Sequence, residues 1–136
     1  MASRVITLDT SALLSLFNMG DPDHDAVRTA FLEDGGPYLV AAGILAEIGF
    51  MAEDRLGLDA LDAFLGDLES GALSLECGDE DLSRVRELVR RYADLPLGFA
   101  DAAVIACAER HGGRVLTLDT RDFGVVAREG TITPLP

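Results

Sequence analysis

The chain has 136 residues, of which 49% are hydrophobic, which fits one globular domain over residues 1–136 and excludes a disordered chain. Its 24 acidic residues outnumber 11 basic ones, all arginine, and give a net charge of −13, which disfavours nucleic-acid binding by bulk electrostatics. Nucleic acid could still bind through bound cations, a local arginine cluster or an oppositely charged partner. No apolar run reaches the roughly 18–20 residues that cross a bilayer. Two separated cysteines, Cys77 and Cys107, indicate structural thiols of a reduced, cytoplasmic protein.

The expected elements alternate between strands and helices. The predicted strands cover residues 5–8, 38–41, 73–75, 115–118 and 131–133. The predicted helices cover residues 12–17, 22–33 after the Asp21-Pro22 start signal, 43–55, 58–68, a segment capped by Asp79 or Asp81, and 99–111. This order predicts an α/β fold with a mostly parallel central sheet and helices on both faces.

Two segments of near-identical sequence end in aspartate. Residues 5–10 read Val-Ile-Thr-Leu-Asp-Thr and residues 115–120 read Val-Leu-Thr-Leu-Asp-Thr, so Asp9 and Asp119 each follow a short apolar strand. The residues after Asp9 begin a helical pattern, whereas residues 121–124 predict a turn. Ligands of parallel sheets bind outside the carboxyl ends of the strands, so both carboxylates face one crevice if the strands are neighbours. Taken singly, either aspartate is equally well explained as a turn or cap residue.

Two further acids lie among apolar residues of the expected helices. Asp101 stands in the first turn of residues 99–108, which are apolar on nearly every face and therefore predicted to be buried. A buried carboxylate needs a partner, although the helix dipole alone would favour an acid in this turn. Glu47 lies three residues after Ile44 and four before Met51, on or beside the buried stripe of its helix. A lone glutamate there most often only reaches towards solvent.

One acidic pocket explains the four acids more economically than four separate structural roles. Gathered carboxylates repel one another and need a counter-cation, and oxygen ligands without a His or Cys cluster indicate Mg²⁺ or Mn²⁺. Such a pocket suits phosphodiester hydrolysis, because the metal activates a water and neutralises developing charge. Weaker candidates are two hydroxyls that could hydrogen-bond the carboxylates and a fifth acid: Ser11, Thr117 and Asp122.

These segments resemble the motifs of PIN-domain proteins. Asp-Thr-Ser-Ala-Leu at residues 9–13 resembles the opening of that domain, and Leu-Ala-Glu-Ile at residues 45–48 resembles its second acidic position. Residues 95–106, Leu-Pro-Leu-Gly-Phe-Ala-Asp-Ala-Ala-Val-Ile-Ala, resemble the third, and residues 116–123, Leu-Thr-Leu-Asp-Thr-Arg-Asp-Phe, the fourth. Order and spacing match over essentially the whole chain, and the size matches the bacterial VapC-type toxins of toxin–antitoxin pairs.

The resemblance implies a PIN-like three-layer α/β sandwich and a Mg²⁺- or Mn²⁺-dependent endoribonuclease, with an acidic quartet of Asp9, Glu47, Asp101 and Asp119. It also implies an RNA substrate, a homodimer, and inhibition by a small VapB-type antitoxin whose C-terminal segment occupies the active-site groove. One departure is Ser11, where the family often has Asn. The charge of −13 suits a protein held by a basic antitoxin segment.

Other functions remain as alternatives. A catalytically silent PIN-like binding module would act only through a protein partner, but such a module has no reason to keep four carboxylates in apolar surroundings. Aspartyl-phosphate chemistry ordinarily requires a lysine near the phosphoryl group, and the chain has none. A metal-free ribonuclease would use histidine as acid and base, but His24 and His111 stand at expected helix ends, where surface histidines are ordinary.

Overall fold

The structure, a computed structural model, describes residues 4–76 and 78–136; the thiol expected at Cys77 lies outside them. Its centre is a five-stranded sheet in the order β3-β2-β1-β4-β5, and every neighbouring pair is parallel. The strands are β1 (Ile6–Leu8), β2 (Tyr38–Ala41), β3 (Ser74–Glu76), β4 (Arg114–Leu116) and β5 (Thr133–Leu135). The sequence predicted a mostly parallel sheet. The prediction is confirmed, and all four strand pairings are parallel.

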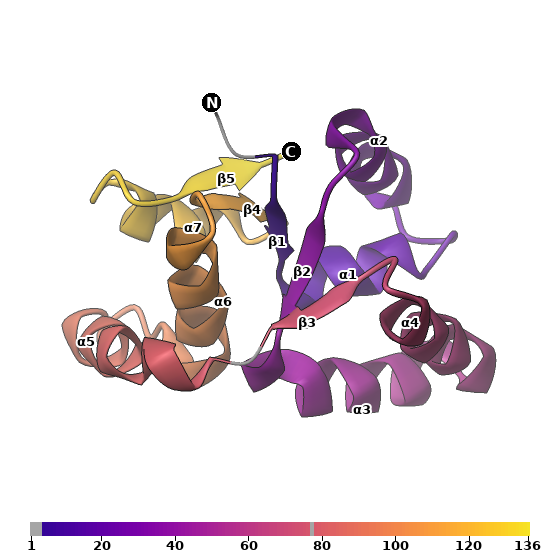
Figure 1. The fold of residues 1–136 in the computed structure, drawn as a ribbon, viewed down its shortest axis with the longest axis horizontal. Coiled ribbons are helices and arrows are strands. Elements are labelled where there is room, and N and C mark those ends of the chain that lie inside the picture. Colours follow the sequence, from indigo (N-terminus) through magenta and orange to yellow (C-terminus); the bar gives the residue numbers. More distant parts are fainter. Residues whose placement is uncertain (1–3, 77) are drawn as a thin grey trace.

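Helices cover both faces of the sheet. They are α1 (Thr10–Leu16), α2 (His24–Asp34), α3 (Leu45–Leu56), α4 (Leu58–Ser70), α5 (Leu82–Arg91), α6 (Gly98–Arg110) and α7 (Thr120–Ala127), with short 3₁₀ segments η1 (Ala42–Ile44) and η2 (Asp79–Asp81). Figure 1 shows α5 and α6 on one side of the sheet and α1 to α4 on the other. None of the helices within the described residues has the length and apolar content that crossing a membrane requires. The arrangement is the expected three-layer α/β sandwich.

The sheet is buried because helices cover it on both sides. Ile6 and Leu8 of β1 and Leu116 of β4 are fully buried, which explains why these strands read as continuous apolar runs. Burying each such side chain contributes roughly 1.5–3 kcal/mol. Helix α6 packs against β1, β2 and β4 through a face rich in alanine, which allows a close approach. A Cβ at Gly43 would lie 2.8 Å from Ala103 Cβ, so η1, which directly follows β2, also packs closely against α6.

Two predicted local structures near the C-terminal end of the chain are wrong. The turn predicted at residues 121–124 is the first half of α7, because Asp119 Oδ1 accepts a hydrogen bond from Asp122 N at 3.0 Å and so caps a helix there. That helix buries Phe123 and Val126. The last strand lies at Thr133–Leu135 rather than 131–133, with Pro134 on the open edge of the sheet, where it removes no ladder hydrogen bond from an inner strand.

Two predicted helix starts also differ from the structure. Helix α2 begins at His24, because Asp21 accepts hydrogen bonds from Asp23 N and His24 N and makes a turn before the helix. Before α5 the chain forms η2, and neither Asp79 nor Asp81 caps the helix with its side chain. The Asp81 carboxylate instead pairs with the guanidinium of Arg110 on α6, with Oδ1 2.8 Å from Nε. Tertiary ion pairing therefore outcompetes local capping here.

Ion pairs also tie α5 to the end of α7. Glu129, two residues beyond α7, accepts a hydrogen bond from the Tyr92 hydroxyl and pairs with Arg84 at 2.9 Å and Arg91 at 3.1 Å. The Tyr92 hydrogen bond first, and then the two arginines, lower the pKa of Glu129 from 4.5 to about 2. Arg84 also contacts Glu109 of α6, with Nε 2.8 Å from Oε1, so one guanidinium joins three segments.

The lowered pKa of Glu129 predicts a loss of stability in acid. The folded state holds the ionised form while the unfolded state takes up a proton below pH 4.5, so stability from this group falls between about pH 4.5 and 2. We expect Glu129→Gln to be less stable than wild type at pH 6, by about 1 kcal/mol after solvent screening, and to lose less stability between pH 6 and pH 3. Urea unfolding at both pH values measures this, and equal losses in the two proteins would contradict it.

Candidate active site

Three carboxylates meet at the carboxyl edge of the sheet. Asp119 follows β4, Asp122 stands in the first turn of α7, and Asp101 stands in the first turn of α6. One carboxylate oxygen from each lies within 4.8 Å of the others, and all three residues are half-buried. We call this group the aspartate cluster. Helix α7, which the sequence pattern did not predict, is what brings Asp122 to the cluster.

Asp9 is buried beside this group and has its own hydrogen bonds. It follows β1 and is 3% exposed. Its Oδ1 accepts hydrogen bonds from Ala12 N at 2.9 Å and Ser11 Oγ at 2.7 Å, and its Oδ2 accepts one from Thr117 Oγ1 at 2.6 Å. Asp9 thus caps α1 and also contacts the loop after β4. The sequence suggested either a helix cap or an acid of the pocket at Asp9, and the same carboxylate can serve as both.

Two hydroxyl groups join the start of α1 to the loop before α7. Ser11 Oγ accepts a hydrogen bond from Leu118 N at 2.9 Å while donating to Asp9. Thr117 Oγ1 accepts one from Asp119 N at 2.9 Å while donating to Asp9. Each hydroxyl therefore links the Asp9 carboxylate to the backbone beside Asp119. Together they hold the ends of β1 and β4 in a fixed relation.

The cluster concentrates negative charge. Burial, followed by the charges of Asp119, Asp9, Asp122 and Glu47, raises the pKa of Asp101 from 3.8 to about 7. Burial also raises the pKa of Asp9, against the hydrogen bonds from Thr117, Ala12 and Ser11. Arg121 gives little compensation, because its Nε lies 3.9 Å from Asp122 Oδ1 and its side chain is 81% exposed. Hard oxygen donors with uncompensated charge fit a divalent cation such as Mg²⁺ or Mn²⁺.

Glu47 lies at the edge of the site. It stands in the first turn of α3, beside the buried Ile44 and Ile48, but its own side chain is exposed. Its Oε1 accepts a hydrogen bond from Thr10 Oγ1 at 2.9 Å, which ties α3 to the start of α1. Glu47 is not part of the compact group of three, and it adds to the raised pKa of Asp101 only as the last of five causes. The structure therefore places Asp122, rather than Glu47, in the compact group with Asp101 and Asp119.

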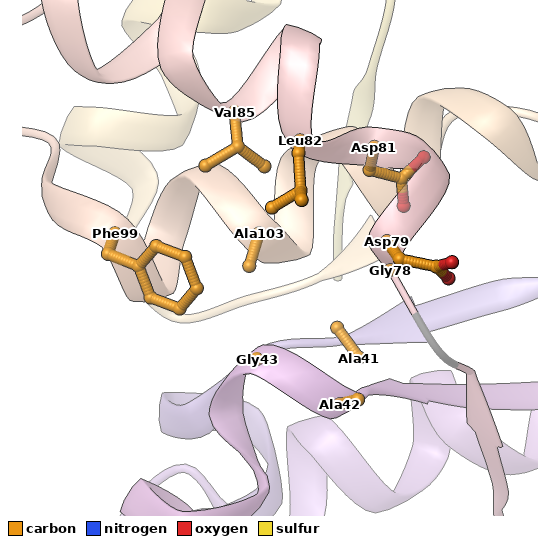
Figure 2. Close-up of a pocket in the computed structure, with 10 residues that line it drawn as sticks. All are labelled: Ala41, Ala42, Gly43, Gly78, Asp79, Asp81, Leu82, Val85, Phe99 and Ala103. Atoms are coloured by element: carbon orange, nitrogen blue, oxygen red, sulfur yellow. The ribbon is translucent and has the colours of Figure 1, made fainter.

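An apolar cavity of about 350 Å³ lies on the face of α6 opposite to Asp101 (Figure 2). Phe99 and Ala103 line it, whereas Asp101 between them projects from the other side of the helix. Figure 2 shows Leu82 and Val85 on α5 facing across the cavity towards the end of β2. Its lining is apolar apart from two aspartates of η2, so acid–metal chemistry is better supported at the aspartate cluster.

The chain belongs to the PIN-domain family, whose family model matches residues 6–129. Among characterised proteins it is similar to "Ribonuclease VapC26" of Mycobacterium tuberculosis strain H37Rv, with 36% identity over 121 residues, covering 88% of this chain and 90% of that protein. The expected family resemblance is thereby confirmed.

Two solved structures share the fold. The crystal structure of Mycobacterium tuberculosis VapC20, described as a sarcin-ricin loop cleaving toxin, superposes with a TM-score of 0.81 at 22% identity, covering 96% of this chain and 99% of that one. VapBC2 from Rickettsia felis, bound to a DNA fragment from its promoter, has a TM-score of 0.69 at 14% identity and 96% coverage of both chains. At such identities these structures support the fold alone.

Proposed function

We propose that this protein, acting as a single domain of residues 1–136, is a metal-dependent endoribonuclease and the toxin of a type II toxin–antitoxin pair. The observation that carries the proposal is the aspartate cluster, in which three carboxylate oxygens lie within 4.8 Å and the pKa of Asp101 is raised to about 7. The protein's membership of the PIN family and its 36% identity to a ribonuclease support the same activity.

Asp9, Asp101, Asp119 and Asp122 would hold the metal, which we propose to be Mg²⁺ or Mn²⁺. The bound cation would activate water, orient a non-bridging phosphate oxygen and neutralise charge as the phosphodiester is cleaved. Asp122 enters this set because its oxygen lies with those of Asp101 and Asp119. Asp9 has one lone-pair site left on Oδ2 after accepting the Thr117 hydrogen bond, which leaves it able to bind a cation.

The other residues of the site orient these carboxylates or move a proton. Ser11 and Thr117 fix the Asp9 carboxylate and, through the backbone of Leu118 and Asp119, the loop that carries the metal ligand. We assign Glu47 to accept the proton of the attacking water, because it is exposed and ionisable beside the cluster. The serine at position 11, where the family often has Asn, still makes two hydrogen bonds within the site.

The partners we propose are an RNA substrate, a VapB-type antitoxin and a second copy of the chain. The net charge of −13 favours a basic antitoxin segment over direct attraction of RNA, so the metal has to compensate the charge of the scissile phosphate. A toxin that cleaves cellular RNA acts in the cytoplasm. The alternative is a catalytically silent PIN module that acts through its protein partner alone.

Cleavage of RNA by the purified protein tests this function. We expect end-labelled total RNA to give discrete fragments with Mg²⁺ or Mn²⁺ and none with EDTA. Mass spectrometry of the same sample establishes that no antitoxin is bound. Intact RNA under every metal condition, with antitoxin-free protein, would overturn the nuclease and favour the silent module.

A further inference from the structure

A second cavity adjoins the aspartate cluster on the side of α1. Its volume is about 330 Å³, at the lower end of the roughly 300–1,000 Å³ range of small-ligand pockets. Ser11, which hydrogen-bonds Asp9, forms one wall. Leu118, directly before Asp119, forms another. A group bound in this cavity would therefore lie beside the residues proposed to cleave RNA.

The polar lining of this cavity has unused hydrogen-bonding groups of both kinds. Arg55, at the end of α3, is exposed, and within the described residues it forms no ion pair. Asp21 uses Oδ1 to accept from Asp23 N at 2.8 Å and Ser15 Oγ at 3.3 Å, while its Oδ2 accepts no hydrogen bond from any residue that the structure describes. The cavity thus offers five guanidinium donors and one open carboxylate oxygen.

Asn18 adds an amide to the polar lining of the same cavity. Its Oδ1 accepts a hydrogen bond from Gly20 N at 3.1 Å, which fixes the side chain and leaves the amide N–H groups as donors. With Leu118, the apolar walls are Leu14 and Leu56. Apolar walls with a few polar groups are typical of sites that bind small molecules.

We propose that this cavity binds a guanine base of the RNA next to the scissile phosphate and so sets where the chain is cut. The proposal rests on the ribonuclease function argued above. Guanine presents O6 and N7 as paired acceptors, which match an arginine fork, and it carries N1–H and N2–H donors for a carboxylate. Adenine, cytosine and uracil cannot offer both paired acceptors to Arg55 and two neighbouring N–H donors to the two lone pairs of Asp21 Oδ2. Single-stranded RNA exposes these edges, whereas a duplex hides them.

Mapping of cleavage sites tests the inference. In a pool of single-stranded RNA oligonucleotides with randomised positions, we expect the wild type to require guanine at one fixed distance from the cut. Arg55→Ala should lower kcat/KM for substrates with that guanine roughly 10- to 100-fold and leave substrates without it within about threefold. Asp21→Asn keeps Oδ1 for the turn while removing the open acceptor, and should relax the same position. Arg4→Ala, which removes a charge at the amino edge of the sheet, is the matched control.

A metal-free binding measurement separates this inference from the proposed function. NMR titration of the wild type in EDTA with GMP, AMP, CMP and UMP should shift the resonances of Asn18 and Leu118 with GMP at lower concentrations than with the others, and Arg55→Ala should abolish the difference. If the protein binds GMP selectively but does not cleave RNA, the proposed nuclease function is wrong and the guanine pocket stands. RNA cleavage that is indifferent to guanine, or unchanged in Arg55→Ala, would overturn the pocket.

Discussion

Asp101→Asn will abolish RNA cleavage while making the metal-free protein more stable. Loss of a proposed metal ligand should lower kcat/KM by at least about 100-fold, since even residues that only orient metal ligands cost 10- to 100-fold. The gain in stability follows from the pKa of Asp101, raised from 3.8 to about 7 by burial and by its acidic neighbours. The folded state then resists losing the proton, so stability falls as pH rises from about 4 to 7. A neutral asparagine avoids that loss.

Thermal unfolding at pH 8 separates the two effects. In EDTA we expect Asp101→Asn to be more stable than wild type by roughly 1–2 kcal/mol, a value reduced for partial exposure of the side chain. At pH 4 the difference should vanish, and with Mg²⁺ it should reverse, because only the wild type gains binding energy. Asp59→Asn, an exposed acid in the first turn of α4, is the charge-matched control. Full cleavage by Asp101→Asn would refute the metal assignment.

The sequence was sufficient to predict which edge of the sheet carries the site. Strands buried on both faces must be apolar along their whole length, so residues 5–8 and 115–118 could be recognised without an amphipathic pattern. The acids that follow them then had to lie at the carboxyl edge. Whether β1 and β4 are neighbours depends on the path of the intervening helices; in the structure Thr7 pairs with Val115 and Leu8 with Leu116.

The finer arrangement depends on contacts that no local pattern records. Thr117 reaches Asp9 across 108 positions of sequence, and Leu118 reaches Ser11 across 107. Asp122 joins the cluster because the backbone after Asp119 closes into a helix, whereas Asp-Phe-Gly alone favours a turn. Glu47 was placed correctly beside a buried stripe, but periodicity does not reveal whether an edge residue faces solvent.

Thr117→Val will destabilise the protein and weaken cleavage together. Valine has nearly the shape of threonine but neither donates to Asp9 Oδ2 nor accepts from Asp119 N, which lie 2.6 Å and 2.9 Å from the Thr117 hydroxyl. A buried carboxylate and a backbone N–H then both lose a partner, at a cost of roughly 2–3 kcal/mol. Because Asp119 loses its backbone anchor as well, we expect kcat/KM to fall by about 10- to 100-fold. Urea unfolding and RNA cleavage measure the two losses.

Two further substitutions show whether the hydroxyl network or packing is responsible. Thr117→Ser keeps the hydroxyl and should retain most of the stability and activity. Thr7→Val removes the hydroxyl of a threonine in β1 that is equally buried but has no nitrogen or oxygen partner within the described residues, and should leave stability unchanged or raise it by about 1 kcal/mol. If Thr7→Val and Thr117→Val cost the same, the link between Asp9 and Asp119 contributes nothing. A cost confined to Thr117→Val would show that one hydroxyl positions two of the proposed metal ligands.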